Sequence, residues 1–148
     1  MHIVQIADGD KKGFMDLLLL ADEQENMIDR YIHRGKMFAL YDGEVKAVCI
    51  VTDEGDGDFE LKNIATHPKY QRMGYGKELV RYLFEYYKEL GTTLYVGTGE
   101  CAMTVGFYRS CGFIHSHSIR NFFVDNYDHP MFADGKQLVD MVYFKKTL

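Results

Sequence analysis

Apolar residues recur along this chain at two spacings, and each spacing predicts a different element. Alternating or short continuous apolar runs are typical of strands, whereas apolar residues three or four positions apart are typical of helices. Strands are expected at residues 2–6, 37–41, 45–52, 59–66, 92–98, 113–119 and 137–145, and helices at residues 11–21, 23–34, 76–90 and 102–110. Residues 121–136 follow neither spacing and are expected to form an irregular arm.

The connections between these elements narrow the fold class. Asp42-Gly43 predicts a tight hairpin between the second and third strands, and residues 53–58 are expected to form an acidic loop. The side of the helix at 76–90 expected to face the core carries Leu79, Val80, Leu83, Tyr87 and Leu90. Strands that precede and follow helices, with hairpins at the front, favour an α+β domain with a mixed sheet. A chain of 148 residues is expected to form one domain, residues 1–148.

Composition and charge argue against several classes of partner. The net charge is −5, which argues against nucleic acid, because phosphate backbones select a basic surface. The longest apolar run, Leu17 to Ala21, is too short for a membrane span, and the first six residues lack the basic start of a secretory signal. Three cysteines without a C-x-x-C pair predict neither a disulfide framework nor a zinc site. A reducing, cytoplasmic location is therefore expected, with Cys49 in the core.

The segment most informative about function connects the strand at 59–66 to the helix at 76–90. It contains a glycine-punctuated loop, residues 71–76, directly before the helix. Backbone N–H groups converge at such a helix start, and the helix dipole favours negative charge there. Gly74 and Gly76 allow close backbone approach or positive φ, and Arg72 and Lys77 add positive charge. The loop therefore predicts a phosphate-binding site.

The spacing of the glycines distinguishes between phosphate-binding motifs. A Walker P-loop would need Ser or Thr after Gly76-Lys77, where the chain has Glu78. A dinucleotide fingerprint would need a third glycine where the chain has Leu79. The pattern that fits is Q/R-x-x-G-x-G/A, preceded here by N-I-A-T-H-P-K-Y. In this segment the chain resembles the GNAT superfamily of acetyl-CoA-dependent N-acetyltransferases. From Asn121 onward it looks like the tail of a subgroup of small bacterial members.

A second segment carries the same resemblance. Residues 107–113 read F-Y-R-S-C-G-F, which is similar to the family's F/L-Y-x-x-x-G-F, a short helix that ends at a glycine and enters a strand. The resemblance spans residues 60–113 and implies the element order β-α-α-β-β-β-α-β-α-β-β. It also implies a mixed sheet flanked by helices, in which two central parallel strands diverge and leave a cleft for the CoA arm.

The resemblance also implies roles for individual residues. It makes Glu60 the candidate general base and Tyr108 the candidate acid that protonates the leaving thiolate. Each has a structural alternative: Glu60 ends an acidic run and could be a solvated carboxylate, and Tyr108 could be a core aromatic. The residues implied to bind acetyl-CoA are Ile64, Ala65, Thr66, Gln71, Arg72, Met73, Gly74, Tyr75, Gly76, Lys77 and Thr98.

The chain departs from the family pattern at one position. Many relatives carry an asparagine seven residues before the tyrosine, where this chain has Cys101. That contact to pantetheine is therefore in doubt, and Thr98 is the expected substitute. A covalent role for Cys101 is disfavoured, since no histidine lies near it in sequence. His115 and His117 alternate along an expected strand and would share one face. They are expected to be polar surface or cleft groups, with no metal bound.

The expected activity is transfer of an acetyl group from acetyl-CoA to a primary amine of a small molecule or peptide, by direct attack in a ternary complex. The acidic run near Glu60 favours a cationic acceptor, such as a polyamine, an aminoglycoside, or a lysine or N-terminal amine. The alternative is a non-catalytic acyl-CoA sensor or interaction module. The aromatic residues of the arm are expected either to wall the acceptor site or to cover a second copy in a homodimer. No nucleic-acid or membrane partner is expected.

Overall fold

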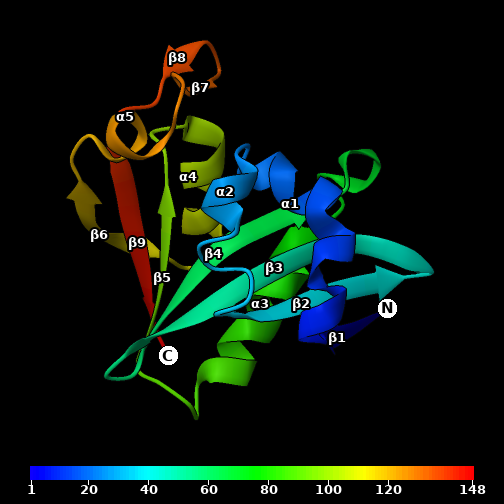
Figure 1. The fold of residues 1–148 in the computed structure, drawn as a ribbon. Coiled ribbons are helices and arrows are strands. Elements are labelled where there is room, and N and C mark those ends of the chain that lie inside the picture. The colour runs from blue at the N-terminus through cyan, green and yellow to red at the C-terminus, as the bar shows by residue number, and fades with distance from the viewer.

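The computed structural model describes residues 1–148 and is built around one seven-stranded mixed sheet (Figure 1). In spatial order the strands are β1 (His2–Ile6), β2 (Lys36–Asp42), β3 (Glu44–Gly55), β4 (Asp58–Thr66), β5 (Thr93–Thr98), β9 (Met141–Thr147) and β6 (Ile114–Ile119). Every neighbouring pair is antiparallel except β4 and β5, which are parallel. The predicted α+β class is confirmed.

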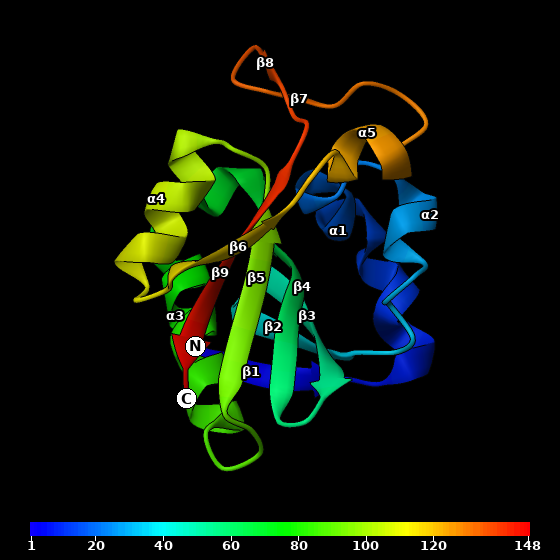
Figure 2. The same ribbon diagram turned by 90° about the vertical axis from the view of Figure 1, so that its left-hand side faces the viewer.

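The helices divide between the two faces of the sheet (Figure 2). One face carries α3 (Tyr75–Tyr87) and α4 (Ala102–Ser110), and the other carries a 3-10 helix (Asp8–Phe14), α1 (Met15–Ala21) and α2 (Glu25–Ile28). Each layer buries its own apolar cluster, of 17 residues beneath α3 and α4 and of 10 beneath α1 and α2. A short 3-10 turn, Pro68–Tyr70, leads into the glycine loop, and α5 (Phe122–Asn126), β7 (Phe132–Ala133) and β8 (Lys136–Gln137) form the arm.

A β-bulge in β4 changes which side chains face which layer. Opposite β3, Ile50 pairs with Asn63 and Val51 pairs with Leu61, so Lys62 is an extra residue in β4. An extra residue reverses the faces of all later side chains, because a strand repeats every two residues. Leu61 accordingly packs in the α3 cluster, whereas Ala65 packs in the α1 cluster.

The pairing between β4 and β5 covers only the beginning of each strand. It runs from Asp58 with Thr93 to Leu61 with Val96 and then stops, although β4 continues to Thr66. Beyond this point the two strands diverge, as the sequence resemblance implies. The backbone of residues 62–66 is therefore not paired on its β5 side, which leaves main-chain donors and acceptors free for another partner.

Several predicted boundaries are wrong in detail. Residues 11–14 belong to a 3-10 helix, and the helix expected at 23–34 is α-helical only over Glu25–Ile28. After α2 the backbone mixes i−3 and i−4 hydrogen bonds up to Gly35. The expected helix at 76–90 ends at Tyr87, so Leu90 is exposed rather than in the core.

Two predicted loops also differ from the structure. The acidic loop at 53–58 is mostly strand, and its turn is only Asp56-Gly57, both with positive φ. The last strand begins at Met141 rather than at 137, and the arm contains α5 and a small hairpin. The Asp42-Gly43 hairpin, the helix at 102–110 and burial of Cys49 are confirmed. No helix combines the length and apolarity needed to cross a membrane.

Candidate active site

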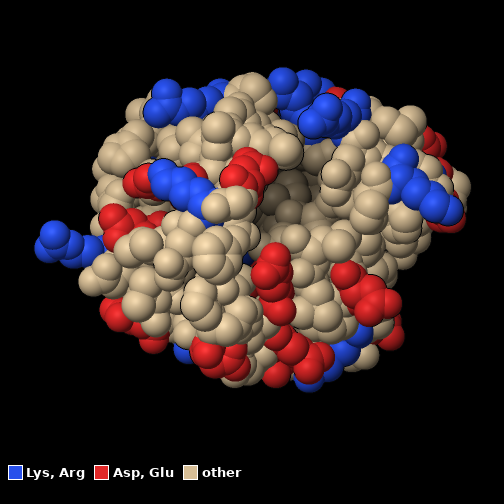
Figure 3. Space-filling view, turned by 90° about the horizontal axis from the view of Figure 1, so that it is seen from above, with Lys and Arg blue, Asp and Glu red and all other residues tan.

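A cleft of about 370 Å³ opens where β4 and β5 diverge. Its walls come from β4, β5, α4, the end of α1 and the arm, and Figure 3 shows a hollow on this face with acidic side chains beside its mouth. Six of the residues predicted from the sequence line it: Ile64, Ala65, Thr66, Gln71, Thr98 and Tyr108. The divergence of two parallel strands therefore brings together residues from both predicted segments.

The glycine loop at one end of the cleft presents a series of free backbone amides. The N–H groups of residues 71–77 donate no hydrogen bond to other backbone groups, and the first helical bond of α3 comes from the N–H of Glu78 to the carbonyl of Gly74. No side chain caps the helix. Arg72 and Gly74 have positive φ, 64° and 89°, which turns successive amides toward one side of the loop. These features make the loop a ready site for an anion.

The basic residues of this loop lie at the surface. Arg72 and Lys77 are exposed, and Met73 is 63% exposed. Gly76 lies close to the neighbouring elements, since a Cβ there would come within 3.3 Å of the Phe107 ring and 3.4 Å of the Thr66 hydroxyl. The loop is thus fixed against α4 on one side, while its charged side chains remain free to contact a ligand.

Tyr108 lies in the middle of the cleft wall. Its ring packs edge-on against Phe107 and Phe113, and it is 8% exposed. Burial raises the pKa of its phenol, so the hydroxyl keeps its proton at neutral pH. Tyr108 therefore packs as a core aromatic and also lines the cleft, so its packing does not conflict with the predicted acid role.

Glu60 lies in a second pocket, of about 220 Å³, which adjoins the cleft. The two pockets share wall residues, including Leu61, Lys62 and Gly97. One carboxylate oxygen of Glu60 accepts a hydrogen bond from the Tyr143 hydroxyl at 3.0 Å and pairs with the Lys62 ammonium at 3.0 Å. The side chain of Glu60 is 13% exposed, so it is not the solvated end of an acidic run.

Sequence patterns did not indicate a second carboxylate in the cleft. Asp22, just after α1, accepts hydrogen bonds from the hydroxyls of Tyr31 at 3.0 Å and Tyr127 at 2.7 Å. Tyr31 in turn accepts one from the amide of Asn63 at 3.1 Å. Burial raises the pKa of Asp22. These four residues come from four separate parts of the chain, and no local motif marks them.

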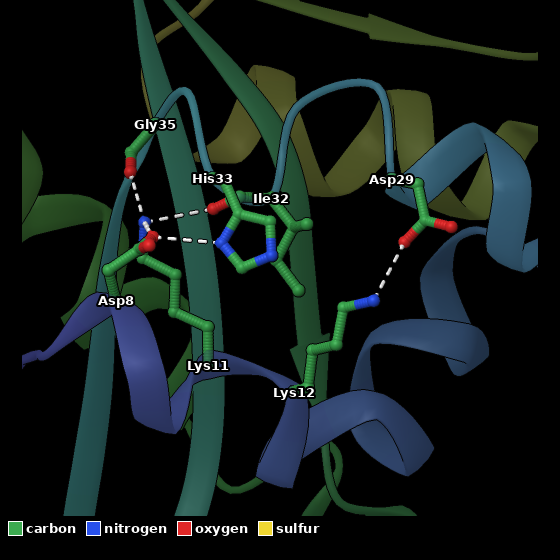
Figure 4. Close-up of polar contacts among 7 residues, drawn as sticks. All are labelled: Asp8, Lys11, Lys12, Asp29, Ile32, His33 and Gly35. Carbon is green, nitrogen blue, oxygen red and sulfur yellow. Dashed lines mark hydrogen bonds and ion pairs between the residues drawn. The ribbon is translucent and has the colours of Figure 1, made fainter.

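A buried lysine, Lys11, holds the segment that follows α2 in place (Figure 4). The ammonium of Lys11 donates to the carbonyls of Ile32 at 2.9 Å and Gly35 at 2.6 Å, and it pairs with Asp8 at 3.0 Å. His33 contacts the same Asp8 oxygen. Because Lys11 bonds two carbonyls after α2, these groups are satisfied without a continuing helix, which accounts for the irregular backbone there.

The arm contributes the aromatic part of the wall. Phe123, Tyr127 and Phe132 line the cleft, and Phe122 lines the pocket of Glu60. The ring of Phe123 stacks on that of Tyr127 at 5.6 Å. Of the two roles expected for these aromatics, walling the cleft agrees with this placement.

The arrangement of His115 and His117 differs from the prediction. A register shift between them, opposite β9, places His115 across from Phe144 and His117 across from Tyr143, which lie on opposite faces of the sheet. His117 stacks on the Tyr143 ring at 4.7 Å. The structure contains no cluster of three or more His, Cys, Asp or Glu suited to a metal ion. Cys101 lines the cleft and donates to Asp134 at 3.3 Å, with no histidine beside it.

A family model, described as the acetyltransferase (GNAT) family, matches residues 7–113. The match includes the diverging strands, the glycine loop and α4. The chain belongs to the GNAT acetyltransferase family. The glycine loop and the cleft described above occupy the positions that the sequence resemblance to this family implies.

Individual GNAT proteins are similar over almost the whole chain. A relative named "Uncharacterized N-acetyltransferase YvbK", from Bacillus subtilis (strain 168), is 32% identical over 142 residues, which cover 94% of this chain and 92% of the relative. The structure of a GNAT family acetyltransferase from Elizabethkingia anophelis with acetyl-CoA bound has a TM-score of 0.92 at 29% identity, covering 99% of this chain and 97% of the other. A Bacillus subtilis acetyltransferase in complex with CoA has a TM-score of 0.91 at 31% identity, covering 99% and 98%. The predicted GNAT fold and acyltransferase class are confirmed.

Proposed function

We propose that this GNAT protein transfers an acetyl group from acetyl-CoA to a primary amine, by direct attack within a ternary complex. The observation that carries the proposal is one cleft whose wall includes Tyr108 and Gln71, the first residue of the glycine loop, with the pocket of Glu60 adjoining it. The similar structures with acetyl-CoA and CoA bound support the choice of donor.

The acetyl donor would bind along the unpaired edge of β4. Its pyrophosphate would accept hydrogen bonds from the amides of residues 71–77, with Arg72 and Lys77 adding charge. Its pantetheine amides would pair with main-chain groups of residues 62–66, which β5 leaves free. Thr98 lines the same cleft and bonds Thr104 at 3.0 Å, so a hydroxyl is present where Cys101 replaces the family's asparagine.

The reaction then requires protons to leave the amine twice and to reach the sulfur once. An alkyl amine has a pKa of about 10 and must lose a proton before its lone pair attacks the thioester carbon. Glu60 would accept that proton directly or through a water molecule. As the carbon–sulfur bond breaks, the Tyr108 hydroxyl would donate its proton to the leaving thiolate, and the second proton of the attacking nitrogen would pass to the Tyr108 phenolate, which leaves a neutral amide and a free thiol. The raised pKa of Tyr108 ensures that the proton is available at neutral pH.

The test is a panel of amine substrates with acetyl-CoA, followed by the release of free thiol. Diamines and polyamines, aminoglycosides, lysine and peptides with free N-termini represent the acceptor classes. Release of thiol that depends on the amine, with acetylated amine as the product, supports the proposal. Tight binding of acetyl-CoA with no turnover on any amine would favour a non-catalytic acyl-CoA sensor instead.

A further inference from the structure

One buried polar atom in the cleft has no partner within the protein. The side-chain oxygen of Asn63 is buried and accepts no hydrogen bond, and it is the only such side-chain atom in the structure. Asn63 is 4% exposed and lines the cleft. Buried acceptors are almost always satisfied in native proteins, so an unpaired one calls for a specific explanation.

The orientation of the Asn63 amide is fixed by its other contacts. Its NH₂ group donates to the carbonyl of Leu18 at 3.0 Å and to the hydroxyl of Tyr31 at 3.1 Å. A backbone carbonyl can only accept hydrogen bonds, so exchanging the oxygen and nitrogen of Asn63 would place two acceptors against each other. The unpaired atom is therefore the oxygen, and a donor for it must come from a bound ligand or a water molecule.

Asp22, like the Asn63 oxygen, is a hydrogen-bond acceptor. Tyr31 accepts from Asn63 and therefore donates to one Asp22 oxygen, and Tyr127 donates to the other. Both hydroxyl groups donate to this carboxyl group, so each of its oxygens acts as an acceptor. Asp22 lines both the cleft and the pocket of Glu60. It also accepts a hydrogen bond from the backbone N–H of Gln24, which leaves about one of its acceptor sites for a further donor. Because burial disfavours its charge, a cationic ligand would offset that penalty.

Two of the three cationic side chains of the adjoining pocket are paired with carboxylates, whereas Arg30 bonds a neutral amide and its charge favours the ionised form of Asp22. Arg30 donates to Asn126 at 3.1 Å, Arg34 pairs with Glu54 at 2.7 Å, and Lys62 pairs with Glu60. Asp22 and the Asn63 oxygen, by contrast, are both hydrogen-bond acceptors. We propose that Asp22 and Asn63 form the recognition site for the amine substrate, which enters as an alkylammonium and donates its N–H groups to them.

This inference deepens the proposed function and rests on it for the identity of the reaction. It names Asp22 and Asn63 as specificity-determining residues that discriminate an alkylammonium from a neutral or anionic group of the same shape. The acidic run at residues 53–58, on which the expectation of a cationic acceptor was based, has no part in this site. Its turn, Asp56-Gly57, connects β3 to the start of β4, whereas the glycine loop follows the end of β4.

The test separates binding from turnover by using n-butylamine, n-butanol and butyrate as probes on protein saturated with CoA. No acetyl group is present, so only binding is measured, from NMR shifts of the Asn63 side-chain NH₂ and the amides of β4. We expect n-butylamine to bind at least tenfold more tightly than n-butanol, and butyrate not to bind. We expect Asp22→Asn and the apolar Asn63→Leu each to weaken n-butylamine binding by about tenfold or more. The matched control, Glu25→Gln, removes the same charge from an exposed position of α2 outside both pockets and should bind as the wild type does.

The outcomes distinguish this inference from the proposed function. Equal binding of n-butanol or butyrate, or wild-type amine affinity in a folded Asp22→Asn variant that still binds CoA, would overturn the recognition site. Selective amine binding without thiol release from acetyl-CoA would leave the recognition site supported and overturn the proposed function. If Asp22→Asn and Asn63→Leu both acetylate the amine with an unchanged KM for the amine, the proposed function would be supported and the recognition site overturned.

Discussion

The two ends of the cleft are built in different ways. The end proposed for acetyl-CoA is a continuous stretch of chain, residues 64–77, that supplies mainly backbone groups. The end proposed for the amine is assembled from Asp22, Glu60, Asn63 and Tyr127, which belong to distant segments. The first can be recognised from a short pattern, whereas the second has no pattern at all.

The difference follows from what each ligand requires. An anion needs several converging N–H groups, and a glycine loop at a helix start provides them without any help from tertiary structure. A buried carboxylate must instead be desolvated and hydrogen-bonded by neighbours, and Asp22 obtains its two phenolic donors from residues 9 and 105 positions away. Perturbing each end should therefore give distinct and separable losses.

The largest effect is expected at the residue that lies between the two ends. Tyr108→Phe should lower kcat by about 10²–10⁴-fold if protonation of the thiolate limits the rate, with little change in acetyl-CoA affinity, because a proton donor acts in the transition state. Steady-state kinetics and calorimetry measure the two quantities. Tyr82→Phe is the control, since Tyr82 packs on Phe38 away from the cleft. Wild-type turnover would leave Tyr108 as a packing residue.

A smaller and pH-dependent loss is expected for Glu60→Gln. The glutamine keeps the shape but cannot take the amine's proton, so turnover should fall by about 10²-fold at pH 7 and recover as the pH approaches the amine's pKa. A pH–rate profile for both forms on one amine checks this. A loss of equal size at every pH would show that Glu60 only anchors Tyr143 and Lys62 and that another group is the general base.

At the other end, Gly74→Asp should weaken acetyl-CoA binding by about tenfold or more. A new carboxylate near the pyrophosphate costs about 1–4 kcal/mol at 4 Å. The fold should survive, because the position has φ of 89° with open space around it and Asp tolerates that region. Gly135→Asp, at φ of 75° and also open, is the matched control. Unchanged affinity in a folded Gly74→Asp variant would remove the loop from the binding site.

The smallest effect is one of stability, and it concerns the amine end. Burial raises the pKa of Asp22 in the folded state, so the protonated form favours folding, and this contribution is lost as the pH rises through the raised value. Asp22→Asn should therefore raise Tm at pH 7, by roughly 2–4 °C for each kcal/mol. This difference in Tm should disappear near pH 4, where Asp22 becomes protonated in both the folded and the unfolded protein. Scanning calorimetry of the variant and the wild type at both pH values measures the difference. A lower Tm for the variant at pH 7 would mean that the bonds from Tyr31 and Tyr127 outweigh the burial of the charge.

Local patterns in the sequence predicted the elements wherever the local signal was strong. The Asp42-Gly43 hairpin, the strand at 59–66 and the helix at 102–110 all form within a residue of their predicted positions. The predicted helix at 23–34 is α-helical only over Glu25–Ile28, and the carbonyls of Ile32 and Gly35 beyond it are bonded by a lysine from another segment, Lys11. His115 and His117 were predicted to share one face of their strand, but a register shift opposite β9 places them on opposite faces. The alternation of residues along a single strand cannot reveal such a bulge.

By itself, the sequence indicated the GNAT family, predicted the glycine loop and made Glu60 and Tyr108 candidates for catalysis. Tertiary structure alone decided which face each residue of β4 presents, because the extra residue Lys62 reverses the faces between Leu61 and Asn63. It also decided that Asp22 lies in the cleft, since its partners are far away in the chain. Backbone-mediated binding is encoded locally by turns and helix ends, whereas a buried charge exists only when the fold surrounds it with donors.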